Sequence, residues 1–166
     1  MRNKKMILAR SAGVGLALAL MVFACGCGGG GGNGGGGADT TAPTISGATA
    51  SPASMGVVDR LPVTIQATVT DNVAVATVTA TVPDFDPVTK QFVTKTISLS
   101  HSTGNTWSAT YTPNTITQIF SSQLIADGDS WAYVYAVAIT ATDSSGNTSQ
   151  PASTSFKTTG FAGPAP

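Results

Sequence analysis

The chain of 166 residues has few charged residues, no glutamate and only two cysteines. Each of these shortages restricts the folds and functions that the chain can have. Both cysteines lie before residue 28, so no disulfide can cross the rest of the chain. Residues that favour long helices, such as Glu, Lys, Gln and Leu, are scarce. Because Thr, Ser, Ala and Val abound instead, the composition favours β-structure over helix.

Basic residues are scarce outside the first ten positions. Those positions hold four of the eight Lys and Arg residues. Without residues 1–24, four cations face eight aspartates, which leaves a net charge of −4. Nucleic-acid binding depends on clustered Lys and Arg that contact phosphates, so we expect no nucleic-acid partner.

Residues 1–24 have the composition of an export signal. A basic segment over residues 1–10 precedes an apolar run of 14 residues, 11–24. A membrane-spanning helix needs roughly 20 apolar residues. An uncleaved anchor that extended back through Met6 would place Arg10 inside the bilayer, which is unfavourable. The pattern therefore favours cleavage near residue 24.

The sequence VFAC at residues 22–25 resembles the lipobox of bacterial lipoproteins, although Phe23 is larger than the residue usual at its position. The resemblance implies cleavage before Cys25 and lipidation of its sulfur and new N-terminus. Two or more acyl chains give a stable anchor. Cys27 is a second candidate, with Ala24 a poorer match. Half of a metal site or a redox pair is the alternative for two close cysteines, but the single His101 is far away in the sequence.

Residues 25–38 are mostly glycine and predict a tether. Glycine has no side chain to bury and loses the most backbone entropy on ordering. A coil of this length has a root-mean-square reach of about 20 Å. In the sorting rule of some bacterial lipoproteins, Gly26 after the lipidated cysteine favours the outer membrane. We therefore expect a bacterial membrane location, facing the periplasm or the cell surface.

Residues 39–158 show strand patterns and turn signals. In LPVTIQATVTD, apolar residues alternate with Thr and Gln, which is typical of a strand with one buried face. Similar runs follow in VAVATVTATV, FVTKTISLS, NTWSATYTP, WAYVYAVAITATD and ASTSFKTT, and APTISGATASP predicts a first strand. The expected inner positions include Val63, Val78, Val93, Trp107 and Tyr135. Residues 114–129 are the exception, because their apolar spacing indicates a short helix or a packed crossover loop.

About seven short strands separated by turns indicate a sandwich of two sheets. The stretches DTTAPTISGATASP, VTIQATVTDNVAVATVTATV, WSATYTP and YAVAITATDSSGNTS resemble bacterial immunoglobulin-like domains, which share their architecture with fibronectin type III and cadherin modules. The resemblance covers residues 39–158 and leaves 159–166 as a tail. It implies an all-β Greek-key sandwich that serves as a spacer, an adhesion unit or a carbohydrate-contacting accessory. It brings no catalytic residues.

The candidate catalytic residues have simpler interpretations as turn residues. His101 lies where a strand runs into a turn, and the pairs Asp84/Asp86 and Asp127/Asp129 lie in loops. Solvated aspartates lack the raised pKa of a general acid. We therefore expect no enzyme, but a structural, adhesive or accessory protein of the cell envelope whose partners are the membrane, other envelope proteins or glycans.

Two ligand sites are candidates. Ca²⁺ prefers aspartate and carbonyl oxygens on loops, and loops after alternate strands meet at one end of a sandwich. Asp71, Asn72, Asp143 and Asn147 could thus approach one another and Asp39, with turn capping as the alternative interpretation. For a glycan, Trp131 and Tyr133 beside the polar DGDS turn are the candidate stacking pair.

Overall fold

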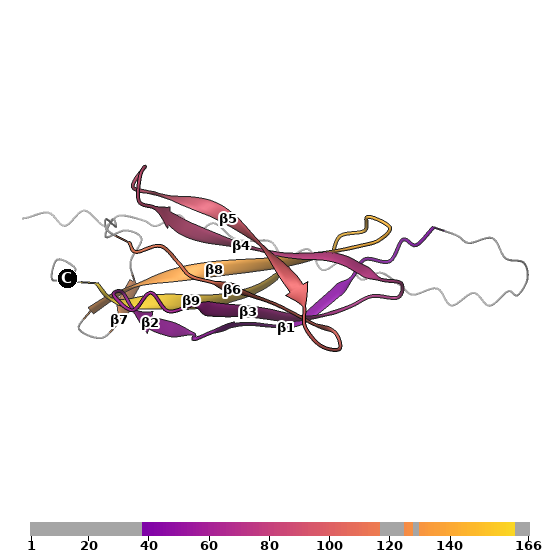
Figure 1. Cartoon of the computed structure of the whole chain (residues 1–166), viewed down its shortest axis with the longest axis horizontal. Helices are drawn as coiled ribbons and strands as arrows, with labels where there is room; N and C mark the ends of the chain where they lie inside the picture. The colour runs from indigo at the N-terminus through magenta and orange to yellow at the C-terminus, as the bar shows by residue number, and fades with distance from the viewer. Residues whose placement is uncertain (1–37, 117–124, 128–129, 162–166) are drawn as a thin grey trace, which may run out of the picture. The chain divides into compact units, whose positions relative to one another are not determined.

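The computed structural model describes residues 38–116, 125–127 and 130–161 (Figure 1). The predicted export signal, Cys25, Cys27 and nearly all of the predicted glycine tether lie outside these residues, as do most of the predicted helix and the end of the tail. Within them every regular element is a β-strand, which confirms the all-β prediction. No helix in this part of the chain could cross a membrane.

Nine strands follow one another along the described chain (Figure 1). They are β1 (Thr44–Ser51), β2 (Ser54–Gly56), β3 (Val63–Thr70), β4 (Val75–Asp86), β5 (Gln91–His101), β6 (Thr106–Tyr111), β7 (Ile125–Asp127), β8 (Ser130–Asp143) and β9 (Ala152–Phe161).

The strands form one hydrogen-bonded path in the order β1-β3-β6-β5-β4-β8-β9-β2, with β7 added to β8. All neighbours are antiparallel except β2 and β9. The link between β5 and β6 is narrow, with only Ser100↔Ser108 and His101↔Trp107 in register. Hydrogen bonding thus gives one nearly closed sheet, where two separate sheets were expected.

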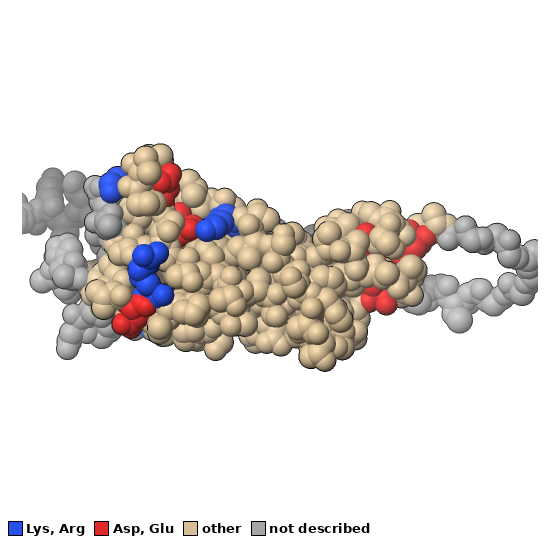
Figure 2. Space-filling view, viewed as in Figure 1, with Lys and Arg blue, Asp and Glu red and all other residues tan. Residues whose placement is uncertain are grey.

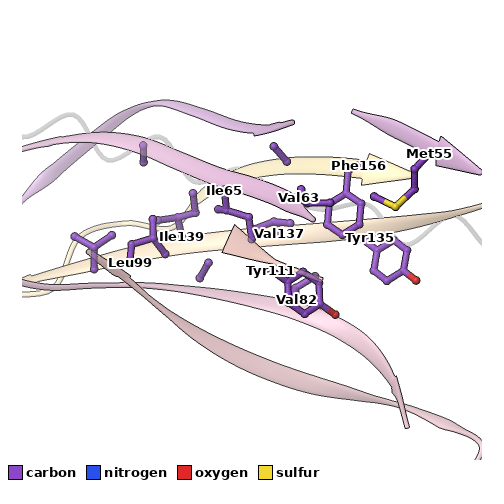
Figure 3. Packing of buried hydrophobic residues seen from close by; sticks show 14 of the residues in the cluster. Met55, Val63, Ile65, Val82, Leu99, Tyr111, Tyr135, Val137, Ile139 and Phe156 are labelled. Carbon is purple, nitrogen blue, oxygen red and sulfur yellow. The ribbon is translucent and has the colours of Figure 1, made fainter. Parts of the chain in front are cut away.

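The core follows the alternation of the sequence. On β3, Val63, Ile65, Ala67 and Val69 are buried, and Thr64, Gln66 and Thr70 are exposed. The predicted inner residues of β4, Val78, Ala80 and Val82, are buried in the same way. Of the two faces that the sequence offers for β8, the one with Tyr135 and Val137 is buried (Figure 3). Because side chains of a strand alternate between its faces, this pattern fixes which face of each strand is inside.

An aromatic group fills the core where β8 and β9 pair. The rings of Tyr135 and Phe156 stack with centroids 4.5 Å apart and an interplanar angle of 8°. Tyr111 meets Phe156 edge-on at 6.4 Å. Such ring pairs add to the stability that their buried area supplies.

The prediction for Val93 was wrong, because its side chain is 47% exposed. Among the described residues β5 pairs with β6 only at Ser100 and His101, so at Val93 its one strand neighbour is β4 and the side chain lies at the edge of the sheet. The neighbouring Phe92 is partly buried instead and packs edge-on against Phe85 at 5.5 Å.

Candidate functional site

Three aspartates from distant parts of the chain meet at one end of the domain. Asp39 precedes β1, Asp71 follows β3 and Asp143 ends β8. One carboxylate oxygen of each lies within 4.8 Å of the other two. Figure 1 shows the same arrangement in the ribbon, since the start of the described chain lies beside the β3–β4 and β8–β9 turns. We call these three residues the aspartate cluster.

Each carboxylate in the aspartate cluster is oriented by its own turn. Asp39 Oδ1 accepts a hydrogen bond from Thr41 N, and Asp71 Oδ2 accepts one from Val73 N, both at 3.0 Å. Asp143 Oδ1 accepts from the backbone N–H groups of Ser145 and Asn147 at 2.8 Å. Aspartate favours such local bonds at turns, so the turn chemistry of the sequence also aims the carboxylates.

Two asparagines join these turns to the start of the domain. Asn72 Nδ2 donates to Asp39 Oδ1 at 3.0 Å. Asn147 Nδ2 donates to Asp143 Oδ2 at 2.7 Å and to the backbone oxygen of Asp39 at 3.0 Å. The structure therefore brings together the four residues that the sequence predicts, Asp71, Asn72, Asp143 and Asn147, and places them beside Asp39, as the sequence also suggested. Both asparagines bind through Nδ2, which makes them positioning residues.

The aspartate cluster leaves two buried acceptors unused. Asp39 Oδ2 and Asp71 Oδ1 are buried and have no hydrogen-bond partner. Buried polar atoms are normally hydrogen-bonded, and a buried negative charge without a counter-charge is costly. Among the described residues, Lys95 Nζ forms an ion pair with Asp84 Oδ2 at 3.6 Å, and this pair does not involve the aspartate cluster. Two oxygens without a partner beside a third carboxylate make a site suited to a cation.

Asp143 remains charged in this setting although its side chain is only 2% exposed. Burial alone would raise its pKa, but hydrogen bonds from the Asn147 side chain and from the backbone of Asn147, Ser145 and Gly146 outweigh it. The pKa of Asp143 therefore lies below its usual value. At neutral pH this carboxylate is ionised and ready to bind a cation.

The ligand atoms of the aspartate cluster are all oxygen, which suits Ca²⁺. Ca²⁺ binds six to eight oxygens at about 2.3–2.6 Å, so two oxygens on one ion lie at most about 5 Å apart. The separation of 4.8 Å fits within that limit. Zn²⁺ and copper prefer nitrogen or sulfur ligands, and the aspartate cluster has neither.

The charge distribution sets this end apart from the rest of the domain. In the view of Figure 2, acidic side chains lie alone at the end that holds the aspartate cluster, and Lys and Arg lie toward the other end. The cations of the described chain are Arg60, Lys90, Lys95 and Lys157. In this view the negative charge at the aspartate cluster therefore has no basic patch beside it.

The predicted stacking pair is not an exposed surface. Tyr133 is 9% exposed, and its ring stacks on Phe92 at a centroid distance of 4.3 Å and an angle of 16°. Trp131 is partly buried and packs against the core. The exposure expected from the neighbouring polar turn was wrong, because β5 supplies an aromatic ring that covers Tyr133.

His101, Asp84 and Asp86, which the sequence offered as candidate catalytic residues, have hydrogen-bond partners within the domain. His101 is exposed, its Nε2 lies 2.6 Å from the backbone oxygen of Gly104, and it is the turn histidine expected. Asp86 forms the predicted turn, accepting from Val88 N at 2.8 Å and from the Thr89 hydroxyl at 2.9 Å. Asp84 differs from the expectation of a loop residue, because it lies inside β4, is buried and accepts from Asn114 N and Nδ2 at 3.0 and 3.1 Å. Asp127 ends β7 and so is also not a loop residue. Its side chain, and Asp129 as a whole, lie outside the described residues.

No protein-family model, curated protein or solved structure matches this chain.

Proposed function

We propose that this protein is a lipid-anchored component of a bacterial cell envelope whose domain is a non-catalytic, Ca²⁺-binding, immunoglobulin-like module. The observation that carries the Ca²⁺ proposal is the aspartate cluster, with two buried carboxylate oxygens that have no partner. A bound Ca²⁺ would offset two of the three negative charges and supply the missing partners.

The strand order supports an immunoglobulin-like fold. In a constant-type immunoglobulin domain, strands A, B, E and D form one sheet and C, F and G the other. Taken as A to G in chain order, β1, β3, β4, β5, β6, β8 and β9 include these neighbours, β1-β3-β6-β5 and β4-β8-β9, and a further antiparallel pairing of β4 with β5 joins the two groups. The narrow β5–β6 junction is where one strand serves both layers.

A Ca²⁺ ion at the aspartate cluster would fasten the entry of the domain. Asp39 comes directly after the glycine-rich segment, and Asp71 and Asp143 belong to turns more than thirty residues away. Coordination by all three would hold the first described residues against two turns of the sandwich.

Calorimetric titration of the full chain with Ca²⁺, in a mild detergent, tests the proposal. We expect saturable heat and a rise in melting temperature, because a ligand that binds only the folded state stabilises it. Asp71→Asn should weaken Ca²⁺ binding by at least about tenfold, since it removes one charged ligand. Asp86→Asn, which changes a turn aspartate outside the aspartate cluster, should leave the affinity unchanged. The absence of heat and of any melting shift at millimolar Ca²⁺ would refute the Ca²⁺ site.

The anchor has its own test. Mass spectrometry of the mature protein should show an N-terminal Cys25 that carries lipid, and Cys25→Ser should release the protein from membranes. A chain that still begins with Met1, or an unmodified Cys25, would overturn the anchor without affecting the Ca²⁺ site.

A further inference from the structure

A groove lies beside the aspartate cluster, between the β3–β4 turn and the β5–β6 turn. Its volume is about 240 Å³, and its lining includes Asp71, Val73, His101, Asn105 and Trp107. Asp71 thus belongs both to the aspartate cluster and to this groove.

Hydrogen bonds fix both walls of the groove. On one side, Asp71 Oδ2 accepts from Val73 N at 3.0 Å. On the other, the backbone oxygen of Asn105 accepts from Val69 N at 2.8 Å, and His101 Nε2 lies 2.6 Å from the Gly104 oxygen. Walls that are ordered before binding reduce the entropy lost when a ligand binds.

The lining combines an aromatic ring with hydrogen-bonding groups. Trp107 is partly buried, and the His101 ring packs against it edge-on at 5.4 Å. Val73 is 59% exposed and adds apolar surface. Asp71, Asn105 and His101 bring carboxylate, amide and imidazole groups, which accept or donate hydrogen bonds. Such a lining suits a ligand that has an apolar face and several hydroxyl groups.

The charges around the groove also restrict the class of ligand that it can bind. The negative aspartate cluster borders the groove, and no Lys or Arg is among its lining residues. An anionic ligand would therefore meet repulsion without a compensating cation.

We infer that this groove binds a neutral oligosaccharide, which stacks on Trp107 and forms hydrogen bonds with Asp71, His101 and Asn105. The inference rests on the proposed function in one respect: Ca²⁺ at the aspartate cluster would hold the Asp71 turn in place, so saccharide binding should weaken when EDTA removes the ion.

Fluorescence can test this groove selectively, because the chain has only two tryptophans. Trp131→Phe leaves Trp107 as the sole reporter, and Trp107→Phe leaves Trp131. We would titrate both full-length variants with chitotriose, cellotriose and maltotriose, in a detergent without a sugar headgroup and with Ca²⁺ present. We expect at least one of these sugars to give a saturable change in the Trp131→Phe protein and no change in the Trp107→Phe protein.

A second variant guards against a folding defect in Trp107→Phe. Asn105 is exposed, and its backbone oxygen, not its side chain, holds the turn. Asn105→Ala on the Trp131→Phe background should therefore weaken saccharide binding about tenfold while Trp107 still reports. Absence of any change with all three sugars, or an undiminished change in Trp107→Phe, would overturn the inference. Calorimetry with Ca²⁺ on the same samples separates this failure from that of the metal site.

Discussion

Asn147 Nδ2 lies 3.0 Å from the backbone oxygen of Asp39, a residue 108 positions earlier in the chain. The same amide donates to Asp143 Oδ2 at 2.7 Å. One side chain therefore connects the β8–β9 turn, a proposed Ca²⁺ ligand and the start of the domain, which makes it a sensitive point for testing the site.

Asn147→Ala should loosen the start of the domain and weaken Ca²⁺ binding. The substitution removes the donor to Asp39 and leaves Asp143 Oδ2 without its side-chain partner. We expect faster hydrogen exchange at the Thr41 amide, which is bonded to Asp39 Oδ1, and a several-fold loss of Ca²⁺ affinity. Asn105→Ala is the matched control and should change neither. Equal effects of the two variants would contradict the positioning role of Asn147.

Phe156→Ala should cost about 3–5 kcal/mol of unfolding free energy, as large-to-small changes of buried aromatic residues do. Phe156 is buried and stacked on Tyr135, so truncation leaves a cavity in the middle of the core. Urea unfolding followed by circular dichroism measures the loss. On the neighbouring strand Val134 is 37% exposed, and Val134→Ala should change the stability by less than about 1 kcal/mol.

Asp84→Ala should destabilise the domain by about 2–3 kcal/mol, mainly through the charge-assisted bonds from Asn114. Lys95→Met should cost less than about 1 kcal/mol, because the Lys95 side chain is half exposed and its ion pair is screened by water. Urea unfolding of both variants checks the order. A larger loss for Lys95→Met than for Asp84→Ala would show that the ion pair, and not the Asn114 bonds, dominates.

Asp86 should titrate below its usual value. The backbone N–H of Val88 and the hydroxyl of Thr89 stabilise its charged form, which lowers the pKa of this carboxyl. A lowered pKa in the folded state means that the bonds of this turn contribute stability above the ordinary value of 3.8, and that the contribution is lost as the pH falls through the folded-state pKa.

NMR titration of the Asp86 carboxyl measures this pKa directly. Thr89→Val should raise it toward the ordinary value, and the bond from Val88 should keep it from reaching that value. Thr94→Val changes an exposed threonine elsewhere on the same hairpin and should leave the titration of Asp86 unchanged. An equal shift in both variants would mean that the Thr89 hydroxyl does not set the pKa of Asp86.

Local pattern predicted the strands well, because a buried face imposes a period of two. β3 alternates apolar and polar residues over nearly its whole length, and a shift of one residue would expose its whole apolar set. The meeting of the turn aspartates Asp71 and Asp143 could also be predicted, since turns after alternate antiparallel strands lie at the same end of a β-domain.

Long-range contacts explain what the sequence pattern missed. Asp84 and Asp86 look alike in the sequence, yet Asn114, in the segment after β6, accounts for the burial of only one of them. Tyr133 lies both in an alternating strand and beside a polar turn, and Phe92 from β5 decides between burial and exposure. In both cases the partner comes from another strand or loop, which no local pattern can identify.

Strands β1 and β2 form the two ends of the hydrogen-bonded path, and both come from the N-terminal part of the domain. One segment therefore covers two edges at once, that of β3 and that of β9. Detachment of this segment would leave two rows of unpaired backbone groups open to pairing with other chains, which is the usual route to aggregation of β-proteins. By holding Asp39, a metal ion at the aspartate cluster would also protect the protein against self-association.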